Sequence, residues 1–349
     1  MSLRFALTAL AMCAAQPLLA QVSTHDGINA RLGGRIQPQY NSTSVGTEPQ
    51  NQMLVRRAFI TIDASRGWLS GRVEADVGEG RLNPKDLFIS ANFSDALHVR
   101  VGQFKRPFDI FELTSDTRIL VVERAGSIRG VSACSGVGGV CTLSRLTEKL
   151  GYSDRDIGVE VSGQGGQLSW SAAMTNGSGA NVEDVNGAKS FTGRLSATVG
   201  PHLQISANAG AHDYIHPVGG SDEYAVAFGG DLQYGDLDHG LVLQAGIVRG
   251  DNWAVPVGTT DAAKFMTAQA ILAYAVPVQN DKLVGVQPLL RVSYADPNTS
   301  VTGDHGMLFT PGINLLFGHR NRLAINLDLW KPNTGTSETS VKVQQFFYF

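Results

Sequence analysis

Residues 69–77 place the strongest constraint on what this chain can fold into. In this segment apolar residues alternate with polar ones. The apolar set is Leu69, Gly71, Val73, Ala75 and Val77, and the polar set is Ser70, Arg72, Glu74 and Asp76. Successive side chains of a β-strand point to opposite faces, so one face is apolar and the other carries three charges. Charges without partners do not line a dry core. The segment predicts a strand with water on one side and an apolar environment on the other.

Alternating segments of this kind recur about 16 times along the chain, an even number, as bacterial membrane barrels require. The links between them alternate in length. Short turns are expected at residues 65–67, 94–96, 164–166, 200–202, 235–238 and 318–321, with longer links between. This asymmetry is typical of barrels with short periplasmic turns and longer outer loops. A soluble β-sandwich is the alternative, but it gives no reason for the alternation.

Residues 1–20 have the features of a secretory signal peptide. Arg4 precedes an apolar run, and small residues precede an expected cleavage after Ala20. Cys13 lies early in that run, so we expect it to leave with the signal rather than carry a lipid. No other segment has the roughly 20 apolar residues of a membrane helix. We therefore expect residues 21–349 to form an all-β, transmembrane antiparallel barrel in the outer membrane of a Gram-negative bacterium.

The last strand and the aromatic residues agree with a barrel. Val341, Val343, Phe347 and Phe349 share one face, as in a closing strand that faces lipid. A terminal Phe resembles the signal read by the barrel-assembly machinery. Tyr224 and Tyr234 also share a face, and ten residues at about 3.3 Å and a tilt near 40° separate them by roughly 25 Å along the membrane normal. That distance matches the apolar band between two aromatic girdles.

One link is far longer than the others: about 50 residues, 104–156, follow the fifth strand. By the alternation it is the third outer loop, and a wide barrel leaves a lumen into which it can fold. We expect it to form the constriction of a channel. Cys134 and Cys141 lie within it, and an even pair this close in an exported protein predicts a disulfide. Two thiols without further ligands argue against a metal site.

Several motifs resemble the phosphate-selective porin O and P family: residues 54–60, 67–76, 101–108 and 112–115, and Glu123-Arg124. The resemblance is sharpest between about Gly33 and Arg124. It implies a 16-stranded outer-membrane porin, commonly a homotrimer, whose selective members guide anions such as phosphate past a ladder of basic residues. The doubled arginine of that family's second strand corresponds to Arg56 and Arg57.

Anion selectivity needs cations that face water in the lumen, where low-dielectric walls focus their field. Strand parity directs Arg322, Lys342 and most of the candidates inward; Arg56 has outward parity near the rim. The candidate pore-lining and anion-binding residues are Arg31, Arg35, Arg56, Arg57, Arg72, Arg100, Lys105, Arg106, Arg124, Arg194 and Arg291. Carboxylates share the inner parity, among them Asp63, Glu74, Glu160, Asp231 and Asp328. The arginines therefore either attract anions or pair with carboxylates and stiffen the wall.

The expected function is passive diffusion of small hydrophilic solutes, with a preference for anions such as phosphate. Alternatives are a general non-selective porin, an adhesin or receptor scaffold, and a barrel enzyme. His212, Asp213 and His216 are the densest histidine group, but their spacing is not that of a catalytic site. We expect no enzyme activity and no cofactor. A net charge of −3 argues against nucleic acid as a partner. The expected partners are outer-membrane lipid, lipopolysaccharide and the assembly machinery.

Overall fold

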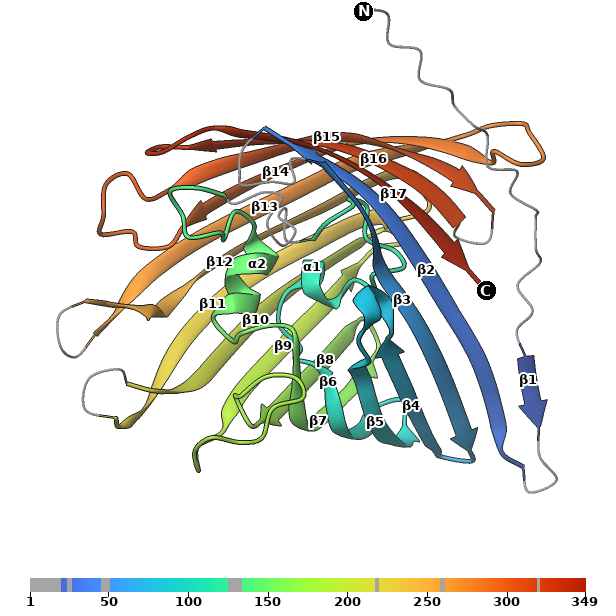
Figure 1. Ribbon diagram of the computed structural model, residues 1–349. Helices are drawn as coiled ribbons and strands as arrows, with labels where there is room; N and C mark the ends of the chain where they lie inside the picture. Colours follow the sequence, from blue (N-terminus) through green and yellow to red (C-terminus); the bar gives the residue numbers. More distant parts are fainter. Residues whose placement is uncertain are drawn as a thin grey trace, which may run out of the picture.

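The computed structural model describes residues 20–23, 27–44, 51–124, 134–216, 220–257, 261–318 and 321–349. Sixteen antiparallel strands, β2 to β17, close into one barrel because β17 pairs with β2 (Figure 1). The expected all-β membrane barrel is confirmed.

The strands are β2 (Asn29–Thr43), β3 (Asn51–Arg66), β4 (Leu69–Asp76), β5 (Asn83–Ser94), β6 (Leu97–Lys105), β7 (Arg155–Gly165), β8 (Leu168–Thr175), β9 (Ser190–Val199), β10 (Leu203–Ile215), β11 (Asp222–Asp236), β12 (His239–Val257), β13 (Asp261–Pro277), β14 (Gly285–Asp296), β15 (Gly306–Phe317), β16 (Asn321–Pro332) and β17 (Glu338–Tyr348).

A further short strand, β1 (Ala20–Ser23), pairs with β2 beyond the end of β17. The backbone N–H of Gly34 on β2 donates to the carbonyl of Phe349 at 3.0 Å. From Leu32 to Asn29, β2 pairs with β1 instead. The expected signal peptide otherwise lies outside the described residues, and its cleavage remains a prediction.

Burial alternates along the strands as the sequence pattern predicts. Along β17, Ser340, Lys342 and Gln344 are buried in the barrel, while Val341 is exposed on the outside. Tyr224 and Tyr234 are both exposed, and Trp68 stacks on Phe93 at 5.4 Å between ring centroids. The apolar outer face is the one that meets lipid.

The link lengths follow the expected alternation except around β13. β12 and β13 extend over 19 and 17 residues, so the outer hairpin between them leaves only residues 258–260 outside the strands. On the turn side, residues 278–284 form a longer link than expected. Strand pairing that continues beyond the apolar band accounts for the first difference.

A β-bulge changes the direction of one predicted site residue. Gln37 pairs with Arg57 and Pro38 with Val55, so Arg56 has no partner residue on β2. Pro38 has no N–H to donate to the neighbouring strand. Arg56 is the extra residue of the bulge, and a bulge changes the direction of the side chain of such a residue. Strand parity alone therefore does not give the direction of Arg56: its guanidinium reaches the long loop, with Nε 2.7 Å from Glu123.

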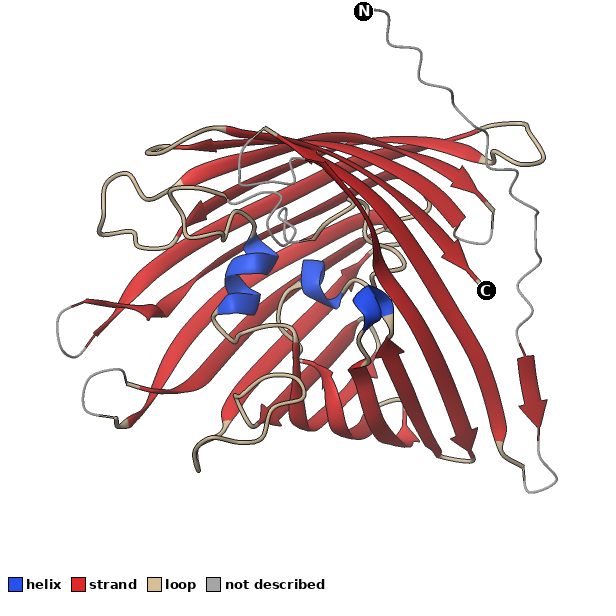
Figure 2. Ribbon diagram, viewed as in Figure 1, coloured by secondary structure: helices blue, strands red, loops and turns tan. Residues whose placement is uncertain are grey.

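The described parts of the long loop between β6 and β7, residues 106–124 and 134–154, fold into the barrel as predicted (Figure 2). It contains the short helices α1 (Ile110–Leu113) and α2 (Leu143–Lys149); a one-turn helix, η1 (Gly78–Gly80), lies in the β4–β5 link. None of the helices in the described residues has the length and hydropathy of a membrane span.

Candidate functional site

The long loop divides the lumen into a dry half and a charged half. Its apolar side chains, including Phe108, Leu120, Leu146 and Tyr152, pack with inward-facing residues of β10 to β16 in one buried cluster. Polar contacts fix the same side: the N–H of Val122 donates to Asn326 Oδ1 at 2.6 Å, and Trp253 Nε1 donates to the Leu150 carbonyl at 2.9 Å. The remaining space therefore lies along β2 to β7, on the other wall.

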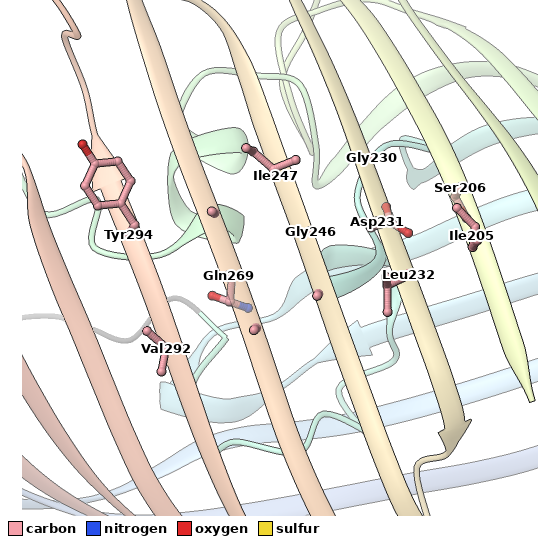
Figure 3. A pocket seen from close by; sticks show the side chains of 13 residues that line it. Ile205, Ser206, Gly230, Asp231, Leu232, Gly246, Ile247, Gln269, Val292 and Tyr294 are labelled. Atoms are coloured by element: carbon pink, nitrogen blue, oxygen red, sulfur yellow. The ribbon is translucent and has the colours of Figure 1, made fainter.

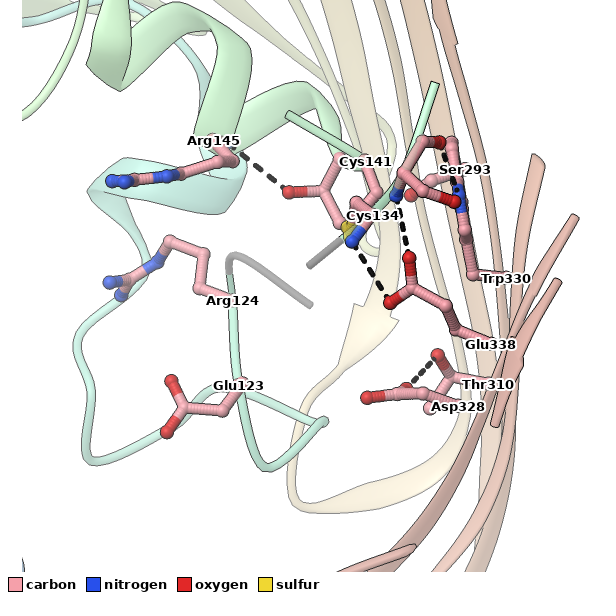
Figure 4. The surroundings of a disulfide bond; sticks show 12 residues. Glu123, Arg124, Cys134, Cys141, Arg145, Ser293, Thr310, Asp328, Trp330 and Glu338 are labelled. Atoms are coloured by element: carbon pink, nitrogen blue, oxygen red, sulfur yellow. Dashed lines mark hydrogen bonds between the residues drawn. A yellow bond between two sulfur atoms is a disulfide. The ribbon is translucent and has the colours of Figure 1, made fainter. Parts of the chain in front are cut away.

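Cys134 and Cys141 form a disulfide, with their Cα atoms 5.5 Å apart, where the loop meets the barrel wall (Figure 4). Glu338 accepts the N–H groups of Cys134 at 3.0 Å and Ser135 at 2.6 Å. Trp330 Nε1 donates to the Ser135 carbonyl at 2.9 Å. The disulfide thus closes a short loop that is tied to β16 and β17.

Three of the predicted site residues lie in the wall or beneath the loop instead of facing open water. Arg291 is 1% exposed, is 3.1 Å from Asp328 and donates to the Glu123 carbonyl at 2.8 Å. Arg194 pairs with Asp231 at 2.6 Å and donates to the Phe108 carbonyl. Arg106 pairs with Asp156 and donates to the Gly151 carbonyl. Arg322 and Lys342 are likewise buried, against Ile119 and Asp328.

Between the long loop and the wall of the charged half lies a ring of ion pairs, which we call the constriction ring because the sequence predicts a constriction at this loop. Asp116 is the centre: Arg124 lies 2.8 Å, Arg35 3.7 Å and Arg57 3.9 Å from its carboxylate. Glu123 binds Arg56, and Arg57 at 3.5 Å. The ring comprises the cations Arg35, Arg56, Arg57, Lys105, Arg124 and Arg155 and the carboxylates Glu74, Asp86, Glu112, Asp116 and Glu123.

Neighbouring cations favour the ionised form of two loop carboxylates of the ring, Asp116 and Glu123. Burial alone would raise the pKa of Asp116, but Arg124 and Arg57, with the further cations around it, hold it well below its usual range. Burial opposes ionisation of Glu123 too, and Arg56 with Arg57 lowers its pKa. The ring contains six cations and five carboxylates, and its lining adds Lys85 together with Asp76, Glu148 and Asp154, which makes seven cations against eight carboxylates. Its net charge is close to zero.

The turn-side mouth of the lumen has a different balance. A cavity of about 490 Å3 is lined by Arg31, Arg72 and Arg100 together with Asp63, Ser70, Ser90 and Asn92. Asp63 pairs with Arg72 at 2.7 Å and with Arg31 at 3.6 Å, and Arg100 lies 3.2 Å from Glu160. The arginine side chains are 57%, 36% and 35% exposed. This vestibule has three cations against two carboxylates, in contact with water.

Sequence reasoning missed the carboxylates of the loop, Glu112, Asp116 and Glu123, as partners of the ring, and it missed Arg155. Arg155 Nε lies 2.6 Å from Asp86 and its guanidinium 3.7 Å from Glu74. Arg155 is the first residue of β7 and has the parity of the exposed Ile157, not that of the inward-facing Glu160, so parity does not predict its contact with carboxylates of the lumen. The direction of loop side chains has no parity signal either.

The histidine group lies buried in the wall. Ser190 Oγ is 3.2 Å from His212 Nδ1 and donates to Asp213, and all three are at most 5% exposed. The carboxylate contacts the serine rather than the imidazole, which is not the order of a nucleophilic triad. No group of His, Cys, Asp and Glu suited to a metal ion occurs among the described residues.

A closed sixteen-strand barrel with an inward-folded loop and a charged, partly open lumen defines the class of outer-membrane porins. The comparisons agree with this class. The outer membrane channel DcaP of Acinetobacter baumannii matches with a TM-score of 0.67 at 12% identity, over 95% of this chain and 100% of that one. The anion-selective porin of Comamonas acidovorans matches with a TM-score of 0.66 at 13% identity, over 92% and 100%.

OmpT of Vibrio cholerae, in its trimer form, matches with a TM-score of 0.61 at 10% identity, over 92% of this chain and 99% of that one. The model of the family described as phosphate-selective porin O and P matches residues 33–222, more than half of the chain. The chain belongs to this family, and it is a channel protein of the bacterial outer membrane. No curated protein matches the sequence.

Proposed function

We propose that this porin passes small hydrophilic solutes by passive diffusion and favours anions, phosphate among them. The observation that carries the preference is the vestibule, where Arg31, Arg72 and Arg100 are exposed against two carboxylates. Guanidinium groups donate paired hydrogen bonds to oxyanions, and a low-dielectric wall strengthens their field. The vestibule raises the local anion concentration, while the nearly neutral ring sets the size limit.

The second candidate is a general porin without ionic preference. The constriction ring favours it, because each of its arginines already has a carboxylate partner. Under this alternative Arg35 and Arg57 hold the long loop against the wall, through Asp116 and Glu123, and attract no permeant. If the vestibule favours anions, the permeability to chloride exceeds that to potassium; in a general porin the two permeabilities are equal.

Reversal potentials across a planar bilayer under a KCl gradient distinguish them. We expect the native channel to prefer chloride, and Arg31→Ala/Arg72→Ala/Arg100→Ala to shift the permeability ratio towards potassium by about threefold or more. The single variant Arg31→Ala is compared with Lys331→Ala, which removes one charge from the outer face and is its matched control. Arg57→Ala tests the ring: an unchanged ratio there would exclude a ladder through the constriction.

Phosphate itself is tested by its block of the chloride current. Block at low phosphate concentration in the native channel, lost in the triple arginine variant, would establish a binding site in the vestibule. A native channel with equal chloride and potassium permeability and no block would overturn the anion preference and leave the general porin.

We also propose that residues 1–20 are cleaved on export, that the barrel-assembly machinery reads the terminal strand, that lipopolysaccharide surrounds the barrel, and that the protein is a homotrimer. OmpT, which adopts the same fold, occurs in a trimer form, which supports the last point. Neither the family nor the fold points to catalysis, and a channel is the function that both support.

A further inference from the structure

The lipid-facing wall of the barrel contains a groove of about 580 Å3 across β10 to β14 (Figure 3). The groove exists because small residues form its floor where other parts of the same belt carry exposed Leu, Ile, Val and Phe. The floor and its borders comprise Gly230, Ala245, Ala268, Ala270, Ile205 and Tyr294. Lipid acyl chains surround this outer face of the barrel.

An arginine lies at the outer end of this groove. Arg249 follows Ile247, a groove residue, by two positions, so both project from the same, outer face of β12. Its neighbours in the register are Phe228 on β11 and Met266 on β13. Arg249 is exposed, and no carboxylate of the described residues forms an ion pair with it. Lys264 nearby is different, because Asp251 binds it.

The height of Arg249 identifies the membrane layer it reaches. β12 begins at His239 on the turn side, and ten residues at about 3.3 Å with a tilt near 40° raise Arg249 roughly 25 Å above that turn. That is the height of the apolar band, so the guanidinium lies where the outer leaflet's headgroups begin. The outer leaflet of this membrane is composed of lipopolysaccharide, whose lipid A carries phosphates directly above its acyl chains.

We propose that this groove is a binding site for one lipid A molecule, with an acyl chain on the floor and a phosphate on Arg249. The two features are complementary to one ligand: an apolar depression for the chain and an unpaired cation at its headgroup end. Near the interface an arginine on the lipid face costs little, and there it can contact anionic headgroups. The site rests on the protein's place in the outer membrane and is independent of which ions it conducts.

The test measures lipid A retained by the full-length protein after extraction from outer membranes into mild detergent, by mass spectrometry per protomer. We expect Arg249→Ala to retain about tenfold less than the native protein, from the loss of a charge-assisted hydrogen bond. Ala268→Phe, which fills the floor, should reduce retention similarly. Lys331→Ala removes an exposed cation of β16, outside the groove, and should change nothing.

Heat-modifiable mobility on gels checks that each variant folds, and Arg249→Lys gives a second, less disruptive variant with intermediate retention expected. Equal retention by native protein and Arg249→Ala would overturn the site. Displacement of lipid A by phosphatidylglycerol at equal concentration would overturn its assignment to lipid A. Cross-links between copies of Arg249→Cys in membranes would mark the face as a subunit interface and overturn it as well.

Discussion

At the scale of residues, the behaviour of the lumen depends on which charges are free and which are paired. A buried arginine beside a carboxylate adds little to the field in a pore, because the two charges cancel at the distance of a passing ion. Arg57, between Asp116 and Glu123, is such a residue. Arg31 is 57% exposed, and among the described residues it pairs with one carboxylate, Asp63, which it shares with Arg72. The Arg31 guanidinium is therefore in contact with solvent, and its field acts on ions in the lumen.

Glu148 makes the ring sensitive to pH. It lines the ring near Asp154 and Glu112; burial, reinforced by these two carboxylates, raises its pKa to about 7, although Arg145 lies 3.1 Å away. A raised carboxyl pKa means that the proton binds as the pH falls through 7, which removes one negative charge. We expect the chloride-to-potassium permeability ratio to rise about twofold between pH 8 and pH 6.

Reversal potentials at the two pH values measure this step. Glu148→Gln is the matched variant: it should show the higher ratio at both pH values and no step. A native step that persists in Glu148→Gln would assign the titration to another group. Asp109 is the nearest alternative, since burial raises its pKa to about 6, but it is 1% exposed beneath the loop.

At the scale of elements, the long loop is held by its apolar side and by hydrogen bonds from its disulfide-closed segment to β16 and β17. Asp109 caps α1 by accepting a hydrogen bond from the N–H of Glu112 at 2.8 Å. It also accepts one from Thr147 Oγ1 of α2 at 2.9 Å, which joins the two helices. The disulfide lies at the other end, against Trp330 and Glu338. The loop is thus fixed at both ends of its apolar cluster.

Removing the disulfide should loosen the loop without unfolding the barrel. For a closed loop as short as residues 134–141, loop-closure entropy predicts a loss of about 2–3 kcal/mol. Trypsin cleavage at Arg145 and Lys149 of α2 should therefore be at least about tenfold faster in Cys134→Ser/Cys141→Ser than in the native protein. Barrel integrity is followed by heat-modifiable mobility. Equal cleavage rates would mean that the apolar cluster alone holds the loop.

At the scale of the whole molecule, the barrel wall separates lipid on the outside from a partly water-filled interior. Lipid covers the outside, and the inside is divided between a dry cluster under β10 to β16 and a wet wall along β2 to β7. The division explains why inward-facing positions such as Val242, Phe265 and Leu289 are apolar. They contact the loop rather than water.

Assembly is the prediction at this scale. We expect native mass spectrometry of the detergent-extracted protein to give three copies of a chain that begins at Gln21. Val73→Arg places a charge on the exposed outer face of β4, and Leu272→Arg does the same on β13. If β2 to β6 form the subunit interface, the first substitution should shift the protein to monomers and the second should not. A native monomer would exclude the trimer.

How far the sequence predicts this molecule differs between strands and loop. All sixteen barrel strands were predictable, since the alternation of apolar and polar side chains is local and each strand obeys it separately. The vestibule arginines followed from the same parity. Arg56 did not, because a bulge opposite Pro38 shifts parity by one residue, and this depends on how β2 and β3 pair.

The barrel, its strand number and its lipid-facing surface follow from consecutive residues, because period-two patterning is local, and the length of the long loop favours its entry into the lumen. Which cations are free follows from contacts between distant parts of the chain. Val122 meets Asn326, and Arg35 meets Glu74 and Asp116, across separations that no local pattern encodes. Pairing of charges is a matter of distance in space, and barrel closure and loop packing set those distances.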